Sequence, residues 1–550
     1  MAAFPLRPLR LFSRLLHLLR GSAFMAAALL LALPVLALLG AWLPQEADGA
    51  QAGAIVRAMA ATVLPGYLWT TLWLGLFVAL GTAVVGTGCA AAVTLFDFPG
   101  RRSFEWLLLL PLAMPAYVTA YAYTDFLQYS GPLQAWLRAS FGLHGRLLPE
   151  VRSLGGAVWV FIFSLYPYVY LLARTALAER AAHLLEAARL LGATPLRRLG
   201  GVALPLARPA VAAGVALVLM ETLADYGVAS YFGIQTFTTG IYKAWLAMDE
   251  RIAAAQLATV LLALVALLLH LELRAQRRMR FAAGGARAGS LEARPMQLRG
   301  RRCLAAWLAC LLPVCMGFVL PVLFMLRPLA ADWSVLPWDR FLQWAGNSVR
   351  LGAVTAVLAV VIAALLAFAL RRRPGAVTRA AVQLVSLGYA VPGAVIVVGL
   401  LLPLGWLQQA VPHWGLPALV TTTALGIVWA YLVRFCAVAL QSVQSGYARI
   451  PASLDDAART LGAGGAGLLA RVHWPLLRRS GAAAALLVFV DVMKELPATM
   501  VLRPFNSDTL AVVAFQLARD ERLGEAALPS LALVAVGLVP VLLLSRTLRR

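Results

Sequence analysis

The stretch "LLEAARLLGATPLRRLGGVALPL" at residues 184–206 is a polar, arginine-bearing segment that lies between two strongly apolar ones. A segment much like it, "LDDAARTLGAGGAGLLARVHWPL", returns at residues 454–476. Each contains an acidic residue, a pair of alanines and, a few positions later, a glycine. The return of a charged loop in so hydrophobic a chain indicates that the protein is a duplication.

The duplication extends well beyond the loops. Displacing the sequence by 270 residues pairs residues 187–193 with residues 457–463. Further upstream the displacement becomes 277 residues and pairs Pro115 with Pro392, as expected if the loop before the fourth span differs in length. The chain is therefore expected to contain two copies of one unit.

We place the first copy at residues 1–273 and the second at residues 303–550. Residues 274–302 join them and are rich in Arg, Gly and Ala without apolar periodicity, which is typical of a flexible linker, here on the cytoplasmic side. An even number of spans per copy gives both copies the same orientation, so they are parallel repeats related by an axis along the membrane normal.

Composition places these copies in a membrane. Of the 550 residues, 62% are hydrophobic and only 13% are charged, whereas soluble domains carry about a quarter charged residues. Apolar runs long enough to cross a bilayer, about 20 residues each, occur at 23–43, 68–95, 105–127, 155–175, 207–229, 253–273, 304–326, 347–370, 378–404, 415–440, 480–502 and 526–545. We expect an all-α integral membrane protein with about twelve transmembrane helices, six in each repeat.

The charge distribution predicts the topology. The net charge of +23 comes from arginines in alternate loops and at both termini, which the positive-inside rule assigns to the cytoplasm, so the charge is not a sign of nucleic acid binding. Residues 44–66 carry more acidic than basic side chains and are placed outside. The first apolar run could instead be a cleaved signal peptide, but its length favours a retained helix.

Two kinds of site are not indicated. The five cysteines lack C-x-x-C spacing and the six histidines are scattered, so neither a disulfide framework nor a zinc site is expected. A phosphate-binding loop needs G-K-[ST], and the only lysines, Lys243 and Lys494, follow Tyr and Met. The chain is therefore not expected to be an enzyme or to bind nucleotide itself.

The first charged loop is predicted to be a bent pair of helices. A helix from about Arg180 to Leu191 should stop at Gly192, and Thr194 with Pro195 should start a second short helix. The alternative is a basic amphipathic loop that rests on lipid headgroups.

These loops resemble the EAA loop of binding-protein-dependent ABC importer permeases of type I. In that family the loop is a coupling helix that docks on an ATPase subunit. The resemblance covers nearly the whole chain and implies a permease with two fused units in the bacterial inner membrane. It also implies two separate ATPase subunits, which bind the ATP and Mg, and a periplasmic solute-binding protein. The positions that match the coupling motif are Glu186, Ala187, Ala188, Gly192 and Pro205, then Asp456, Ala457, Ala458, Gly462 and Pro475.

The second loop departs from the family pattern. It has Asp456 in place of the Glu and His473 with Trp474 before its final proline. Gly464 and Gly465 are expected to break its second short helix.

Carboxylates inside apolar runs are candidate functional groups, because they are costly to place there. Glu221 and Asp225 are four positions apart, which on a helix puts them on one face, and the repeat pairs them with Asp491 and Glu495. Oxygen ligands of this kind suit a hard cation, so the four acids are a candidate transient site in the translocation pathway. The alternative is that Lys494 neutralises one acid and the others serve packing or gating.

Two stretches resemble the ferric-iron permeases of this superfamily: residues 221–245, which contain "TFTTGIY", and residues 493–504. Fused thiamine permeases share the architecture, so thiamine or another small solute is an alternative substrate. A secondary transporter with twelve spans is a further alternative, in which the acids would carry protons, but it leaves both charged loops unexplained.

Overall fold

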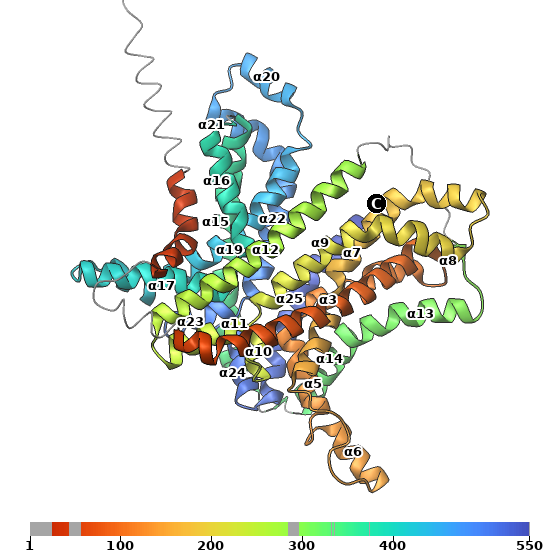
Figure 1. Cartoon of the computed structure of the whole chain (residues 1–550). Helices are drawn as coiled ribbons and strands as arrows, with labels where there is room; N and C mark the ends of the chain where they lie inside the picture. The colour runs from red at the N-terminus through yellow and green to blue at the C-terminus, as the bar shows by residue number, and fades with distance from the viewer. Residues whose placement is uncertain are drawn as a thin grey trace, which may run out of the picture. The chain divides into compact units, whose positions relative to one another are not determined.

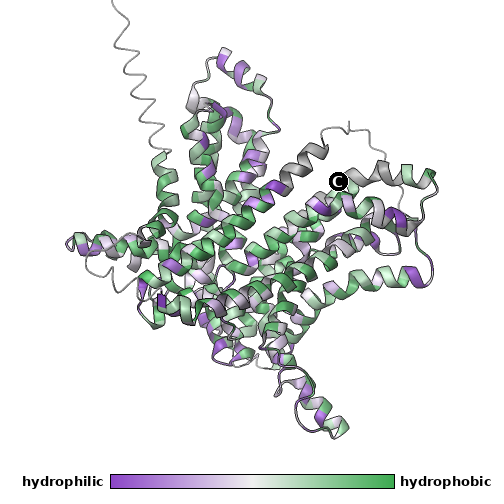
Figure 2. Ribbon diagram, in the orientation of Figure 1, coloured by the Kyte–Doolittle hydropathy of each residue, from purple (hydrophilic) through white to green (hydrophobic). Residues whose placement is uncertain are grey.

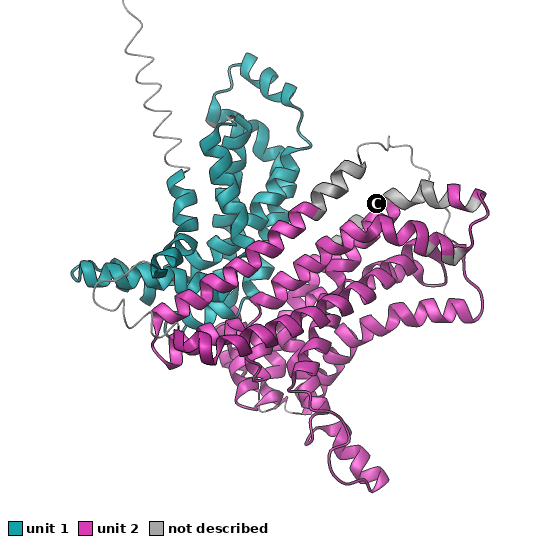
Figure 3. Ribbon diagram, in the orientation of Figure 1, with its two compact units in different colours: residues 1–44, 346–508 teal, residues 45–345, 509–550 magenta. Residues whose placement is uncertain are grey.

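The protein is described by a computed structural model for residues 25–42, 57–283, 296–331, 333–334, 336–372 and 374–548. It divides into two compact units, which Figure 3 colours separately. Unit 1 comprises residues 1–44 and 346–508, and unit 2 comprises residues 45–345 and 509–550.

Unit 2 is built from helices, most of them hydrophobic along their length (Figures 1 and 2). Its α-helices are α3 (Leu64–Leu95), α4 (Arg101–Leu107), α5 (Ala116–Leu127), α6 (Pro132–Phe141), α7 (Leu154–Leu190), α8 (Pro195–Arg198), α9 (Leu204–Ala224), α10 (Gly227–Tyr231), α11 (Phe237–Tyr242), α12 (Arg251–Ala283), α13 (Arg301–Val314), α14 (Leu320–Ala331), α24 (Leu510–Arg519) and α25 (Leu523–Leu548). The 3-10 turn η2 (Leu110–Ala113) and the π-helical segments η3 (Leu199–Ala203), η4 (Lys243–Ala247) and η5 (Cys315–Val319) connect them. α15 (Trp338–Arg372) begins in the sequence assigned to unit 2 and continues in unit 1.

Unit 1 contains the rest of α15 and the helical segment Met25–Trp42, which ends in the 3-10 turn η1 (Leu38–Trp42). Its other helices are α16 (Ala376–Leu387), α17 (Gly393–Ala410), α18 (Leu416–Thr422), α19 (Ala424–Tyr447), α20 (Ala452–Thr460), α21 (Gly465–Gly467), α22 (Trp474–Lys494) and α23 (Pro497–Leu502). The 3-10 turn η6 (Gly388–Ala390) precedes α17, and the π-helical segment η7 (Leu468–His473) precedes α22.

Ten helices in the described residues are long and apolar enough to cross a membrane, or eleven if the bent pair Arg101–Ala113 and Ala116–Phe141 forms one span. The predicted all-helical membrane fold is confirmed, but the number of spans by this measure is lower than the expected twelve. The run predicted at 480–502 is not among them. It is split between α22 and α23, and α22 carries several charged side chains.

Several helices of the two sequence repeats begin or end at equivalent positions. α9 and α22 begin at Leu204 and Trp474 and end at Ala224 and Lys494, a displacement of 270 at both ends. α5 and α17 begin 277 positions apart, each directly after a proline, as the sequence alignment requires.

The compact units do not coincide with the two sequence repeats. The segment Met25–Trp42 belongs to unit 1, whose other residues come from the second repeat. Its backbone packs so closely on α17 that a side chain at Gly399 would collide with the Pro34 carbonyl. The Trp429 indole also donates a hydrogen bond to the Leu30 carbonyl, at 3.0 Å. Conversely, α13 and α14 of the second repeat lie in unit 2, because each repeat's opening helix packs on the other repeat's sequence.

The segment predicted as a flexible linker is partly structured. Residues 274–283 continue α12, and residues 284–295 lie outside the described part of the chain. β2 (Met296–Gln297) then pairs in parallel with β1 (Phe96–Asp97). This pairing could not be predicted from sequence, since two residues are too few for a strand pattern.

Small residues set the helix packing in unit 2. A Cβ at Gly86 of α3 would lie 2.7 Å from Val169 Cβ, and a Cβ at Gly214 of α9 would lie 2.7 Å from Val169 Cα. α7 is therefore held between two helices that approach it through glycine, the packing mode that favours close helix association in membranes.

Candidate coupling loops and intramembrane acids

The first charged loop has a sharp bend at Gly192. α7 ends at Leu190, and Gly192 adopts a left-handed conformation with φ of 78°. The backbone amide of Ala193 donates to the Ala188 carbonyl at 2.9 Å, which satisfies a carbonyl at the helix end. The predicted helix stop at Gly192 is confirmed. The side chain of Glu186 lies outside the described part of the structure.

The second half of this loop differs from the prediction. α8 does begin at Pro195, but it is not a separate short helix, because the chain continues through η3 directly into α9. Pro205 lies in the first turn of α9, where a backbone N–H has no partner within the helix, so the proline costs no hydrogen bond. The loop is thus one bend between two long helical segments.

The second charged loop repeats the bend. Gly462 has φ of 82°, and the amide of Ala463 donates to the Ala458 carbonyl at 2.9 Å. The expectation that glycines break the following helix is wrong, since Gly464 is its N-cap and Gly465 its first residue. A side chain at Gly465 would collide with the Arg372 guanidinium, so glycine here allows a close approach.

Both bends expose an apolar side chain. Leu191 is 87% exposed and Leu461 is 89% exposed, and the two leucines occupy equivalent positions of the repeats. Exposed apolar side chains next to a helix end are suited to insertion into a groove on a partner protein. The sequence showed these leucines in the alignment, but their exposure depends on the bend.

In the second loop, the motif acid is exposed and the acid before it is buried. Asp456 is exposed and pairs with Arg459 at 3.3 Å on the same helix. Asp455, one position earlier, is buried. Its carboxylate accepts bonds from Arg371 Nε at 2.8 Å and from His473 Nε2 at 2.9 Å.

Arg371 at the end of α15 fastens the start of α20. Besides Asp455, its guanidinium donates to the backbone carbonyls of Tyr447, Ile450 and Pro451 at 3.2, 2.9 and 3.1 Å. These carbonyls form the break between α19 and α20, where the first repeat has one uninterrupted helix, α7. The only sequence signals for this cluster were the paired aspartates and the unusual His473.

The environment of Asp455 favours its charged form. Burial raises the pKa of its carboxyl, but the hydrogen bonds from Arg371 and His473 outweigh burial and leave the pKa below its usual value. His473 is fully buried, and its Nδ1 lies 3.2 Å from the Tyr447 hydroxyl. α20 of the second repeat is therefore tied to two neighbouring segments by a buried polar cluster.

The prediction that Glu221 and Asp225 share one face of a helix is wrong. Glu221 lies in α9, but α9 ends at Ala224, and Asp225 follows in extended conformation. Asp225 Oδ1 accepts the amide of Val228 at 2.8 Å and so caps α10. The membrane helix is broken at this acid.

The second pair repeats this arrangement in unit 1. Asp491 and Lys494 belong to α22 and interact electrostatically with each other. Glu495 follows the helix end, and its carboxylate accepts the amides of Ala498 and Thr499 at 2.9 and 3.0 Å.

Arg434 is the basic partner of Glu495. Its guanidinium lies 3.7 Å from the Glu495 carboxylate, and the Thr499 hydroxyl donates to the same carboxylate at 2.7 Å. Glu495 is therefore engaged in local structure. These contacts fit the alternative in which Lys494 neutralises one acid, here Asp491, while Asp225 and Glu495 are hydrogen-bonded at helix ends. Among the described residues no group of three His, Cys, Asp or Glu side chains could hold a metal ion.

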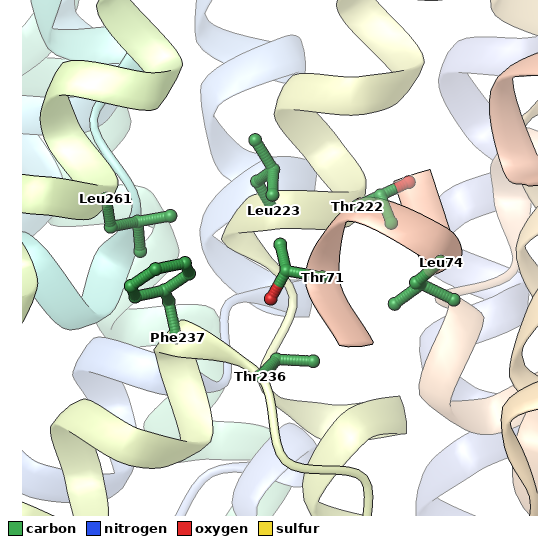
Figure 4. Close-up of a pocket in the computed structure, with 7 residues that line it drawn as sticks. All are labelled: Thr71, Leu74, Thr222, Leu223, Thr236, Phe237 and Leu261. Atoms are coloured by element: carbon green, nitrogen blue, oxygen red, sulfur yellow. The ribbon is translucent and has the colours of Figure 1, made fainter. Parts of the chain in front are cut away.

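A small cavity lies beside the break after α9 (Figure 4). It holds about 10 Å³, close to the smallest space for one water molecule. The buried Thr71 hydroxyl, which has no hydrogen-bond partner among the described residues, contributes polar surface. The remaining lining residues are Leu74, Thr222, Leu223, Thr236, Phe237 and Leu261. The cavity can hold a water but not a solute.

Comparison with known proteins identifies the architecture. The sequence profile of the family described as "Binding-protein-dependent transport system inner membrane component" matches residues 83–280, which include the first charged loop. Residues 83–280 thus carry the domain of this family, and the chain as a whole resembles its permeases. It has the type I permease fold of ABC importers and is a multi-pass inner-membrane protein.

Several permeases resemble this permease in sequence. It is 24% identical to the "Fe(3+)-transport system permease protein FbpB 2" of Haemophilus influenzae over 87% of its own length and 89% of the relative's. It is also 24% identical to a probable ABC transporter permease, y4fN, of Sinorhizobium fredii over 88% of its own length and 87% of the relative's. A sulfate permease, CysW of Escherichia coli, is 32% identical over 30% of this chain and 54% of the relative. The first two relatives thus align with most of this chain and over most of their own length.

Proposed function

We propose that this permease carries ferric iron across the inner membrane, delivered by a periplasmic solute-binding protein and powered by separate ATPase subunits. The observation that carries the coupling part is the pair of bends at Gly192 and Gly462, each of which presents a leucine that is almost fully exposed. Two equivalent docking elements fit two ATPase subunits. ATP and Mg would be bound by those subunits and not by this chain.

The residues assigned to docking fall around these bends. Ala187, Ala188, Ala457 and Ala458 have small side chains that allow close helix approach, and Ala188 and Ala458 supply the carbonyls that close the bends. Asp456 is exposed at the rim of the second loop and can meet a basic group on the partner, while Asp455 holds the loop in place. Glu186 is assigned to the equivalent rim position of the first loop by its place in the sequence.

Iron is favoured by the relative that aligns over most of the chain and is named an Fe(3+) permease. The 2-aminoethylphosphonate permease PhnU of Salmonella typhimurium and the sulfate permease align over only 34% and 30% of this chain. The broken membrane helices also present acids, which suit a hard cation better than an oxyanion. Thiamine or another small solute remains the alternative substrate, and a proton-coupled secondary transporter is the alternative class.

The test is reconstitution of the permease with its ATPase and binding protein in liposomes. Entry of radioactive iron that requires both ATP and the binding protein is the expected result. Uptake driven by a proton gradient without the ATPase would overturn the ABC assignment. ATP-driven uptake of thiamine, phosphonate or sulfate, with none of iron, would overturn the substrate assignment and leave the coupling assignment intact.

A further inference from the structure

Five tyrosines gather around the break that follows α9, all within unit 2. Tyr121 and Tyr231 have ring centroids 4.7 Å apart, and Tyr226 and Tyr242 have centroids 4.3 Å apart. Tyr117 adjoins Tyr121 at 5.7 Å. All five side chains are buried. We call these residues, together with Asp225, the tyrosine cluster.

One hydroxyl in this cluster lacks a partner. Tyr121 is 1% exposed, and its hydroxyl makes no hydrogen bond to any described residue. The ionisable groups that act on it are Tyr117, Tyr231, Asp225 and Tyr226, in that order. A buried hydroxyl without a partner is costly, so its presence in a cluster whose Asp225 carboxylate interacts with it electrostatically points to a ligand that completes the site.

The fold itself does not require these tyrosines. In the second repeat, Ala394 and Val398 occupy the positions of Tyr117 and Tyr121, on the equivalent helix α17. Leu496 and Val501 stand at the positions of Tyr226 and Tyr231. The same backbone elements are thus built with apolar side chains in one repeat and with phenols in the other. Packing alone does not explain why only the first repeat has them.

An exposed ion pair covers one side of the cluster. Arg152 lies over the Tyr231 ring at 4.8 Å and donates to the Tyr231 hydroxyl at 3.3 Å. Its charge is balanced by Glu521 at 3.1 Å, and that carboxylate is 72% exposed. A solute could therefore reach the cluster from solvent by displacing one surface ion pair, which is worth little in stability.

We propose that the tyrosine cluster is a transient binding site for a trivalent hard cation, with the Tyr121 phenolate and the Asp225 carboxylate as ligands. Both are hard oxygen ligands, and binding would release the phenolic proton. The Asp225 carboxylate favours a positively charged solute, because it repels an oxyanion. This inference rests on the proposed transport of ferric iron and places the site in the first repeat alone.

The test compares two tyrosines that lose only a hydroxyl. Tyr121→Phe removes the proposed ligand. Tyr166→Phe is the matched control, because Tyr166 is also fully buried in unit 2 with an unpartnered hydroxyl, but its ionisable neighbours are Cys89, Tyr170 and Cys310. Each purified complex is titrated with ferric nitrilotriacetate while the visible phenolate-to-iron charge-transfer band is recorded. Iron uptake per assembled complex and ATPase activity are measured on the same samples.

We expect wild type and Tyr166→Phe to show the band, and Tyr121→Phe to lose it and to transport iron about tenfold more slowly with unchanged ATPase activity. A Tyr121→Phe complex that keeps both the band and the uptake would overturn the site but not the iron permease. Equal losses in both variants would assign these tyrosines to packing. Failure of the wild type to transport iron would instead reject the proposed function. If inorganic sulfate or phosphate bound the wild-type complex and no ferric band appeared, the cluster would be a site for an oxyanion.

Discussion

Arg371 and Asp455 form a two-point ion pair, with Nε to Oδ2 at 2.8 Å and Nη2 to Oδ1 at 3.1 Å, which joins the end of α15 to α20. The first repeat has Thr94 and Leu185 at these positions, so the pair is a property of the second repeat. In the second repeat, a break before Pro451 separates α19 from α20, whereas the equivalent helix of the first repeat, α7, is continuous. The ion pair restores a fixed position for the loop.

Acid should loosen the second coupling loop. Because the pKa of Asp455 is lowered in the folded protein, its stabilisation is present above the pKa of the unfolded carboxyl and is lost as the pH falls through the folded value. We expect the thermal midpoint of the detergent-purified permease to fall below about pH 4. The Asp455→Asn variant should be less stable at neutral pH and should lose this part of the pH dependence. Asp456→Asn is the control, since its exposed pair contributes little; equal effects of the two variants would contradict the assignment.

Gly192→Ala should impair coupling, because an L-residue in the left-handed conformation costs about 1 to 2 kcal/mol. Nothing lies within 4 Å of the added Cβ, so backbone conformation alone is tested. We expect weaker co-purification of the ATPase and lower ATP-dependent uptake at normal membrane abundance. Gly200→Ala has equal space and no positive φ, and it should behave as wild type. Gly192→Trp, with a bulky group at the docking surface, should abolish uptake.

Glu495→Gln should reduce stability more than selectivity. The change removes the charge that faces Arg434 in a buried site, and breaking such a pair costs about 3 to 5 kcal/mol. Lower abundance and a lower thermal midpoint are expected, with normal uptake per surviving complex. Glu525→Gln, at an exposed pair with Arg522, should cost less than about 1 kcal/mol. A stable Glu495→Gln protein that fails to transport iron would argue for a direct role in the pathway.

Two glycines on α3 should tolerate substitution very differently. Gly86→Leu places a side chain against Val169 of α7 and should prevent the close approach of α3 and α7, whereas Gly88 has nothing within 4 Å. We expect strongly reduced abundance for Gly86→Leu and near-normal abundance for Gly88→Leu. Immunoblots of membrane fractions with detergent melting curves give the measurement. Similar abundance of the two proteins would refute this account of helix packing.

The arginine distribution predicts cytoplasmic termini. Reporters fused after Gly285 and after Arg550 should register cytoplasmic, and one after Asp48 should register periplasmic. Paired alkaline phosphatase and fluorescent protein fusions measure both outcomes. A periplasmic signal after Gly285 would change the number of spans by one and undo the parallel arrangement of the repeats.

Sequence reasoning predicted the features that depend on local chemistry. Apolar length predicted membrane helices, and the alignment predicted equivalent elements such as α9 and α22. Gly192 ends its helix as predicted, and Gly462 does the same in the second repeat, because only glycine enters the left-handed region at little cost. The prediction failed where two conformations suit the same residues: Gly464 and Gly465 can break a helix or begin one, and here they begin α21.

By itself, then, the sequence determined the class of protein, the repeat and the position of its bends, since hydropathy and backbone preference act over neighbouring residues. Only the tertiary structure decided what each polar group does. Glu495 is a helix cap paired with Arg434, from a distant part of the chain, and Asp455 instead of Asp456 is the buried acid of the second loop. It also decided that Met25–Trp42 packs within the unit built from the second repeat. Such pairings depend on burial between segments far apart in sequence, where partners are selected by shape and by the high cost of leaving a charge unpaired.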